Sequence, residues 1–277
     1  MRTISLEDEF GDVIRKARVG RVLSIDAVAQ RVGLIVPDLE KAERYLSVPG
    51  DETIRELAAV LGLNAPALLD LAHKRYEPAR TAFESLGTAS MVSSSYGSGV
   101  VNCYAVWDSS SGEGAFFDTG VDFAALEQLQ ARHGFAVRCV FVTHTHGDHI
   151  GVLGEVQRRW KPTVVVGAHE PLPGARLVEQ DTEFALGMLN VEAFPTPGHS
   201  AGGLSFYVEG FGADRPALCV CGDTLFAGSA GGPMYSYEAL MRSVRRELLS
   251  LDDGTILCPG HGPLTTVGGE KSHNPFA

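Results

Sequence analysis

The chain has 277 residues, of which 44% are hydrophobic and 21% are charged, and its formal net charge is −11. This composition is typical of a soluble globular protein of one or two domains, and the acidic balance disfavours general affinity for nucleic acid or anionic membranes. No apolar run is long enough to span a bilayer, and the opening MRTISLEDEF has no signal-peptide core. We therefore expect a cytoplasmic protein with no membrane contact, in which the five cysteines are reduced.

Residues 1–72 are predicted to form a small all-helical domain. Apolar residues recur at helical spacing in five short segments, and no strand pattern lies between them. Ser24 is the candidate N-cap of the second segment, and Gly33 follows the last residue of that segment. The predicted helices cover about residues 6–18, 25–32, 37–44, 53–61 and 66–73.

This succession of helices resembles the Cro/repressor-type helix-turn-helix family over about residues 10–72. The resemblance implies a helix-turn-helix fold, and the activity of that family is DNA binding. It rests on framework positions, which provide small residues for the helix crossing, a glycine for the turn and apolar residues for the core. These positions are Leu23, Ser24, Ala29, Gly33, Glu43, Arg44, Leu57, Ala58, Leu61 and Gly62.

The segment that would read DNA, IVPDLEKAERY, argues against duplex binding. It opens with Ile35, Val36 and Pro37, whereas a helix-turn-helix contacts bases and phosphates with polar side chains from this part of the motif. Residues 1–77 hold 11 basic and 13 acidic side chains, so no overall positive charge compensates. We hypothesise that the domain has lost DNA binding and either dimerises the chain or packs on the second domain. The contact would be a small exposed apolar patch of Ile25, Ile35 and Val36.

The polar segment HKRYEPARTAFESLG, residues 73–87, is predicted to be a linker, because it contains Pro78 and interrupts the periodic patterns. Residues 88–277 are rich in glycine and β-branched residues, which predicts a second domain of the α/β class. Its first hairpin turn is predicted at DSSSGEG, residues 108–114, between the apolar runs NCYAVW and AFFDTG.

The segment VFVTHTHGDHIG, residues 140–151, places four potential metal ligands directly after a predicted buried strand. His144 and His146 are two residues apart, so on extended chain both side chains point to the same side and reach one ion. Asp148 and His149 follow where the chain turns into a predicted helix, and they can face a second ion. Imidazole and carboxylate together suit zinc, manganese or iron, and the absence of a nearby cysteine argues against a structural zinc finger.

Three further candidate ligands stand downstream, each next to glycine at the end of a strand-like run. His199 follows FPTPG, Asp223 follows LCVCG, and His261 follows TILCPG. Strand ends collected at one edge of an α/β fold form active sites. Seven candidate ligands of this kind are enough for two metal ions.

At these residues the sequence resembles the metallo-β-lactamase superfamily over residues 88–277, and GDTLFAGS and CPGHGPLTTVGGEKSHNPF resemble the glyoxalase II-type hydrolases. The resemblance implies an αββα sandwich, preceded here by the small helical domain. It also implies two divalent ions at one edge of the sheets, with zinc expected and iron or manganese as alternatives. The implied ligands are His144, His146 and His199 on one ion, Asp148, His149 and His261 on the other, and Asp223 bridging both.

This site predicts a hydrolase that acts on a small-molecule thioester or related ester. Two divalent ions lower the pKa of a shared water, and the resulting hydroxide attacks the carbonyl carbon. Asp148 is the candidate to orient that nucleophile or shuttle its proton, and Asp223 is the candidate bridging carboxylate. Three alternatives stay open: a lactonase with the same site, a persulfide dioxygenase with a single iron, and a DNA-binding regulator with a metal-dependent sensor domain.

A few other residues are weaker candidates. Tyr235, Tyr237 and His169 lie in loops near the predicted ligands and are candidate substrate contacts. Asp118 ends a strand, where it either orients a ligand histidine or caps the turn. Glutathione recognition does not carry over from the resemblance, because the sequence ends at NPFA without the helical domain that supplies much of that site in glyoxalase II.

Overall fold

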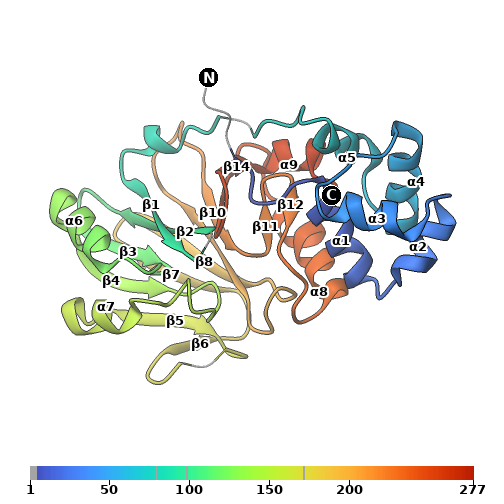
Figure 1. Ribbon diagram of the computed structural model, residues 1–277. Coiled ribbons are helices and arrows are strands. Elements are labelled where there is room, and N and C mark those ends of the chain that lie inside the picture. The colour runs from blue at the N-terminus through green and yellow to red at the C-terminus, as the bar shows by residue number, and fades with distance from the viewer. Residues whose placement is uncertain (1–4, 79, 98, 171) are drawn as a thin grey trace.

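The computed structural model describes residues 5–78, 80–97, 99–170 and 172–277. Two six-stranded sheets face each other, and helices cover their outer faces (Figure 1). The first sheet has the order β1-β2-β3-β4-β5-β6, with bounds Ala89–Tyr96, Gly99–Trp107, Glu113–Phe117, Ala136–Phe141, Thr163–Gly167 and Arg176–Val178. The second has the order β14-β13-β10-β9-β8-β7, with bounds Thr265–Thr266, Ile256–Pro259, Leu218–Gly222, Leu204–Glu209, Leu189–Pro195 and Thr182–Leu186. This is the predicted α/β class.

The helices of this part lie on the outer faces of the two sheets. The first sheet carries α6 (Phe123–His133) and α7 (Leu153–Trp160). The second carries α8 (Tyr237–Arg242) with the π-helical turn η2 (Ser243–Glu247), followed by η3 (Leu248–Ser250) and α9 (Val267–His273). A short hairpin of β11 (Leu225–Phe226) and β12 (Ser229–Ala230) connects β10 to α8.

Alternation along the central strands produces separate cores on the two faces of each sheet. Phe141 of β4 packs between the sheets against Phe206 of β9, with ring centroids 5.2 Å apart. The preceding residue, Val140, faces the outer core beneath α6 and α7. In β10, Val220 faces the core between the sheets and Cys219 faces the outer helices. Each strand is buried on both sides, which explains its nearly continuous apolar sequence.

The N-terminal part consists of α1 (Phe10–Gly20), α2 (Ile25–Arg31), α3 (Val36–Glu43), α4 (Asp51–Leu61) and α5 (Ala65–Ala72). Ser24 accepts a hydrogen bond from the Ala27 backbone at 3.2 Å and so caps α2, and Gly33 takes the left-handed conformation, φ 65°, after that helix. The first helix begins at Phe10 and not at residue 6, because the preceding residues, from Leu6, run in extended conformation to the second part of the molecule.

The five N-terminal helices share one apolar core with the helices below the second sheet. That core joins Ile14 and Leu61 to Leu240, Val244 and Leu257. In Figure 1 the helices α1 to α5 lie against α8 and α9 at one end of the sandwich. The helical part therefore packs on the catalytic part within the same chain.

A buried polar network reinforces this junction. Lys16 of α1 donates to Asp8 Oδ2 at 2.5 Å and to the Ala230 carbonyl at 2.8 Å. Ser229 donates to the same Asp8 carboxylate at 2.6 Å. Asp8 is 6% exposed, so its charge depends on these partners.

The predicted apolar patch of Ile25, Ile35 and Val36 is wrong. Ile25 and Val36 are half-buried against the core of the helical part, and only Ile35 is exposed, at 65%. The reason is that α2 and α3 turn those side chains toward α1 and α4 and not toward solvent. Among the residues that the structure describes, no helix is both long and apolar enough to cross a membrane, and the five cysteines are free.

Candidate metal centre

Seven side chains converge where four strands of the sandwich end. Their ligand atoms form three overlapping groups, and within each group all atoms lie within 4.8 Å of one another. The loop after β4 contributes four of them, and the loops after β8, β10 and β13 contribute one each. The groups are His144, His146 and His199, then His144, His149 and Asp223, and then Asp148, His149 and His261. The structure therefore brings together all seven residues singled out from the sequence.

The first group is a set of three ring nitrogens that face one another. His144 Nε2 lies 2.9 Å from His146 Nδ1, and His199 Nε2 lies 3.0 Å from the same His146 atom. Neutral imidazoles that meet through unprotonated nitrogens repel each other, so a proton or a cation must stand among these atoms. This is the arrangement in which three histidines bind one metal ion.

Four of the five histidines are held through Nδ1, so that Nε2 points into the centre. Asp118 Oδ2 accepts from His149 Nδ1 at 2.7 Å, and Thr143 Oγ1 lies 3.1 Å from His144 Nδ1. Backbone carbonyls hold the other two: Gly232 accepts from His199 at 2.8 Å, and Val100 accepts from His261 at 2.7 Å. These partners fix both the ring orientation and the tautomer that leaves Nε2 free to bind metal.

Asp118 supports two ligand loops at once. Its carboxylate also accepts from the Thr143 backbone and from the Thr143 hydroxyl, both at 2.7 Å. The side chain is 1% exposed, and the residue takes a left-handed backbone conformation, φ 57°. Of the two roles expected for it, the structure places Asp118 in contact with a candidate ligand histidine.

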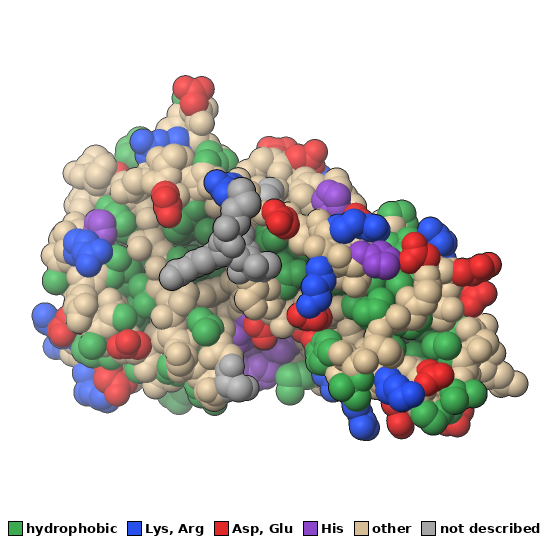
Figure 2. Space-filling view, turned by 45° about the horizontal axis from the view of Figure 1, so that its top comes forward, with side chains coloured by type: hydrophobic (Ala, Val, Ile, Leu, Met, Phe, Trp, Pro, Cys, Tyr) green, Lys and Arg blue, Asp and Glu red, His purple; other side chains and the backbone are tan. Residues whose placement is uncertain are grey.

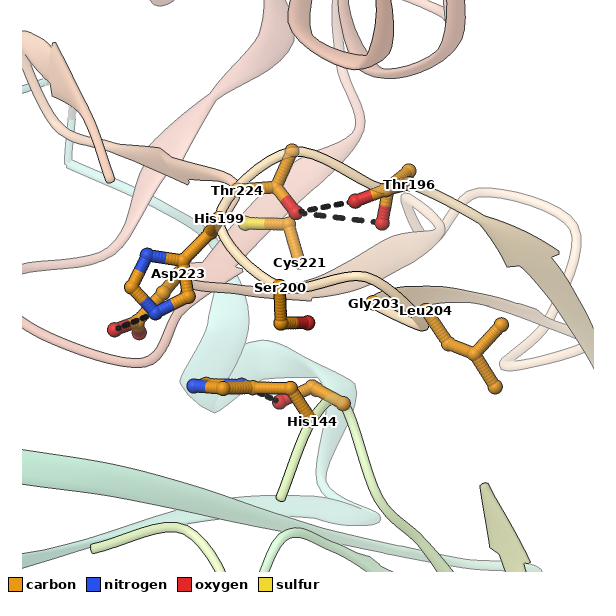
Figure 3. Close-up of a pocket in the computed structure, with 10 residues that line it drawn as sticks. His144, Thr196, His199, Ser200, Gly203, Leu204, Cys221, Asp223 and Thr224 are labelled. Carbon is orange, nitrogen blue, oxygen red and sulfur yellow. Dashed lines mark hydrogen bonds and ion pairs between the residues drawn. The ribbon is translucent and has the colours of Figure 1, made fainter. Parts of the chain in front are cut away.

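Asp223 lies between the two histidine sets. Its Oδ2 is 3.5 Å from His199 Nε2 and 3.4 Å from His261 Nε2, and its Oδ1 is 3.4 Å from His149 Nε2. Figure 3 shows His199 and Asp223 joined by a dashed line above the ring of His144. A Cβ on Gly260 would lie 2.3 Å from Asp223 Oδ1, which explains why glycine precedes His261. Asp223 is thus placed to contact both ions.

The pattern of unpaired atoms fits a metal centre. Among the described residues, His149 Nε2 and Asp223 Oδ1 are buried without a hydrogen-bond partner. A buried polar atom left unpaired costs about 1–3 kcal/mol, and a divalent cation between these two atoms would satisfy both. A third such atom, Ser200 Oγ, faces a cavity of about 10 Å³ behind His144, which is the size of one water molecule.

Burial and neighbouring charge divide the protonation of the histidines. Burial, together with the nearby His149, lowers the pKa of His144 well below its ordinary value, so this ring is neutral. Burial also lowers the pKa of His199. Burial opposes charge at His261 too, but Asp223 and the Val100 carbonyl raise the pKa of that ring to about 9. Metal binding at the His261 side therefore requires release of a proton.

The other candidates from the sequence lie away from the ligand atoms. His169 is exposed in the loop after β5, and Tyr235 is 62% exposed before α8. Tyr237 turns toward the N-terminal helices, where its ring packs on Gly20. The space-filling view shows the main group of histidine side chains beside carboxylates near the junction of the larger and smaller parts of the molecule (Figure 2).

Two residues near the centre escaped the sequence analysis. Glu170, next to His169, accepts from the backbone and hydroxyl of Thr145 and from the Gly202 backbone, so it joins the loop of the first histidines to the loop of His199. Tyr96 ends β1, and its hydroxyl lies 3.5 Å from where a Cβ of Gly147 would be. Nothing local in the sequence distinguishes either residue, because both act through contacts across the fold.

Comparison with known proteins agrees with this geometry. The family model described as the metallo-beta-lactamase superfamily matches residues 96–261. The chain belongs to the metallo-beta-lactamase superfamily. Membership indicates an enzyme of the metallo-hydrolase type, and the superfamily fold binds divalent metals, in agreement with the His and Asp clusters. The superfamily match begins at residue 96, so it does not cover the N-terminal helices.

Three similar superfamily proteins cover most of their own length with this chain. It is 33% identical over 184 residues to the probable metallo-hydrolase YqgX of Bacillus subtilis (strain 168), covering 58% of this chain and 85% of that protein. It is 28% identical over 201 residues to the hydroxyacylglutathione hydrolase GloC of Haemophilus influenzae, covering 63% and 92%. The solved structure of TTHA1623 in a di-iron-bound form matches with a TM-score of 0.57 and 28% identity, covering 67% and 100%.

Proposed function

We propose that the protein is a two-metal hydrolase of a small-molecule thioester or related ester. The observation that carries the proposal is the unbroken series of seven ligand side chains, in which His144 and His149 each belong to two neighbouring groups. One ion would be held by His144, His146 and His199, and the other by Asp148, His149 and His261, with Asp223 contacting both. Two divalent ions held there would lower the pKa of a water shared between them and polarise the substrate carbonyl.

The chain's own residues would position the reacting groups. Asp148 Oδ2 lies 3.4 Å from His261 Nε2 and 4.0 Å from His149 Nε2, at the open side of the centre. One carboxylate oxygen of Asp148 remains available to accept a proton from the attacking water and to hold its orientation. Glu170 and Asp118, below the ligand loops, keep those loops fixed while charge develops on the substrate oxygen.

The composition of the site favours a substrate with a good leaving group. All seven histidines and carboxylates of the three groups are candidate ligands, so none of the seven is a dedicated acid for a poor leaving group. A thiol has a pKa of about 8.5 and departs as thiolate without prior protonation. An amide nitrogen needs a proton first. Thioesters therefore suit this site better than amides do.

The names of two similar proteins support the same class of reaction. The relative from Haemophilus influenzae is named a hydroxyacylglutathione hydrolase, which is a thioester hydrolase, and the relative from Bacillus subtilis is named a probable metallo-hydrolase. The di-iron title of the third keeps iron open beside zinc and manganese as the native metal. We carry over the bond type and not the glutathione part of the substrate.

The test is hydrolysis by the full chain loaded with zinc, iron or manganese. Release of free thiol from S-lactoylglutathione and from a short acyl-coenzyme A is measured with a thiol reagent. We expect turnover of at least one thioester and complete loss in D223A, with unchanged circular dichroism. Opening of an acyl-homoserine lactone without thioester turnover would favour a lactonase, and oxygen consumption with glutathione persulfide and one iron would favour a dioxygenase.

We propose further that the N-terminal helices keep a helix-turn-helix-like fold without binding duplex DNA. The support is the acidic surface of the predicted reading helix, together with the packing of all five helices on the catalytic part. A fluorescence titration with random 30-base-pair duplex and with the gene's own upstream region tests this. We expect no binding below 10 μM as an order-of-magnitude limit for non-specific contact. Salt-sensitive, sub-micromolar binding would instead support the regulator alternative.

A further inference from the structure

A second cavity lies at the junction between the N-terminal helices and α8, apart from the metal centre. Its volume is about 420 Å³, and Figure 1 shows α8 beside α1 at this junction. We call it the junction cavity. Residues from the ends of α1 and α4 form one wall, and α8 and η2 form the other. The lining residues are Arg21, Leu23, Gly62, Tyr237, Glu238, Met241 and Arg245.

Two glycines allow the walls to approach and keep the cavity in one shape. A Cβ on Gly20 would lie 2.3 Å from the Tyr237 ring, and a Cβ on Gly62 would lie 2.7 Å from Arg21 Nη1. On its other side α8 rests on Gly198, where a Cβ would lie 2.2 Å from the Leu240 Cα. The wall that carries Tyr237 is thus held from both sides, so the cavity is formed before any ligand enters.

The charges in the junction cavity are not neutralised by the protein. Within the described part of the chain, neither Arg21 nor Arg245 lies within ion-pair distance of a carboxylate, and Arg245 spends only its Nε on the Phe276 carbonyl. The one acidic lining residue, Glu238, pairs with Arg242 at 3.3 Å. Two unpaired guanidinium groups in one cavity stand out in a chain with a net charge of −11.

The Tyr237 hydroxyl adds a polar group between the two arginines. Burial raises the pKa of Tyr237, while the positive charges of Arg21 and Arg245 lower it, which places the phenol near both. Leu23 and Met241 provide apolar surface in the same cavity. Guanidinium groups bind carboxylates and phosphates through paired N–H donors, and a phenol can donate a third hydrogen bond.

We propose that the junction cavity binds a small organic anion, with a carboxylate or phosphate group held by Arg21, Arg245 and Tyr237 and a short apolar part against Leu23 and Met241. The ligand bridges the N-terminal helices and the catalytic part, so it stabilises their packing. This site differs from the metal centre in lining residues and in chemistry, and it does not depend on hydrolase activity.

Isothermal titration calorimetry of the full chain with octanoate, octyl phosphate and inorganic phosphate tests the site. We expect octanoate or octyl phosphate to bind once per chain and to raise Tm, and inorganic phosphate to bind more weakly because it lacks the apolar part. R21M and R245M should each weaken binding about tenfold or more, since each removes a charge-assisted contact. Binding by octanoate alone would identify a carboxylate ligand, and binding by octyl phosphate alone a phosphate ester.

The controls separate this site from the rest of the surface and from the metal centre. R246M changes an exposed arginine next to Arg245 that does not line the cavity, so it should bind like the wild type. D223A should also bind like the wild type, because it alters only the metal centre. If R21M does not fold, R21K keeps the charge without the paired donors and should bind several-fold more weakly. The absence of binding by either octyl compound, or binding unaffected by R21M and R245M, would overturn the proposal.

Discussion

Asp118 Oδ2 accepts a hydrogen bond from His149 Nδ1 at 2.7 Å, and both side chains are buried. The contact directs His149 Nε2 toward Asp223, where it has no other partner among the described residues. A residue on β3's loop thus determines how a residue 31 positions later faces the metal centre. The carboxylate acts on the ligand and not on the substrate.

The variant D118N tests this support. Asparagine tolerates the left-handed backbone of position 118, so the fold should survive while the charge is lost. We expect metal affinity or turnover to fall about 10–100-fold, as for other partners of metal-bound histidines. Competition with a zinc chelator measures the affinity. D181N, at an exposed position, is the control, and equal affinity in the two variants would show that Asp118 only caps its turn.

The variant E170Q tests the connection between two ligand loops. Glu170 receives three hydrogen bonds, two from Thr145 and one from the Gly202 backbone, and glutamine replaces its charge and one acceptor. We expect kcat to fall several-fold with a smaller change in KM, because the loops carry ligands and not substrate contacts. Steady-state kinetics on a thioester measures both constants. E179Q, an exposed change on β6's far side, should leave both unchanged.

The variant K16M tests the buried network at the junction. Without the Lys16 ammonium, the Asp8 carboxylate keeps only Ser229 as a partner in a buried position. Removing one member of such a pair costs about 3 kcal/mol, so Tm should fall by several degrees. The double variant D8N/K16M should recover part of the loss. K41M, which breaks only an exposed pair with Asp38, should change Tm little, and an equal fall in K16M and K41M would contradict the account.

Buried Glu270 predicts a pH dependence of stability. Its carboxylate accepts from Thr265 Oγ1 at 2.6 Å, from the Gly228 backbone at 2.9 Å, from Asn274 at 2.8 Å and from the Tyr76 hydroxyl. Burial raises the pKa of Glu270 despite these hydrogen bonds, which lower it. A raised pKa means that the folded state binds the proton more tightly than the unfolded state, whose glutamate pKa is about 4.3. The contribution to stability is therefore fully present below that pH and is lost as pH rises through the folded pKa.

Thermal melts of the wild type and E270Q between pH 4 and pH 8 measure this contribution. Glutamine does not titrate, so the Tm of the wild type minus that of E270Q should decrease as pH rises. E52Q, at an exposed position in α4, should follow the wild type at each pH. A Tm difference between wild type and E270Q that is constant or grows with pH would show that the sign is wrong.

Local patterns in the sequence were enough for the helices and for the ligand loops. Ser24 caps α2 as predicted from its place before an apolar-periodic segment, and the loop from His144 to His149 follows a buried strand as predicted. Both features depend on neighbours in the chain. The start of α1 was misplaced because Asp8 is held by Lys16 and Ser229, and the latter is a contact across 221 residues.

Contacts across the fold account for the other differences. The periodicity of α2 and α3 does not tell which neighbour covers Ile25 and Val36, so they were expected on the surface. Tyr237 follows the Asp223 loop in sequence, yet α8 turns it toward Gly20. Glu170 and Tyr96 have no motif of their own, because their roles depend on loops that only the folded sandwich brings together.

The most direct measurement for the two-metal account is the metal content of the folded chain and of D223A. Both proteins are loaded with zinc, freed of excess metal and analysed by plasma mass spectrometry beside a protein assay. Asp223 lies 3.4–3.5 Å from ring nitrogens of both candidate ligand sets, so the account predicts two ions per wild-type chain. It predicts one or fewer in D223A, with the fold intact by circular dichroism. One ion per wild-type chain, or two retained in D223A, would contradict it.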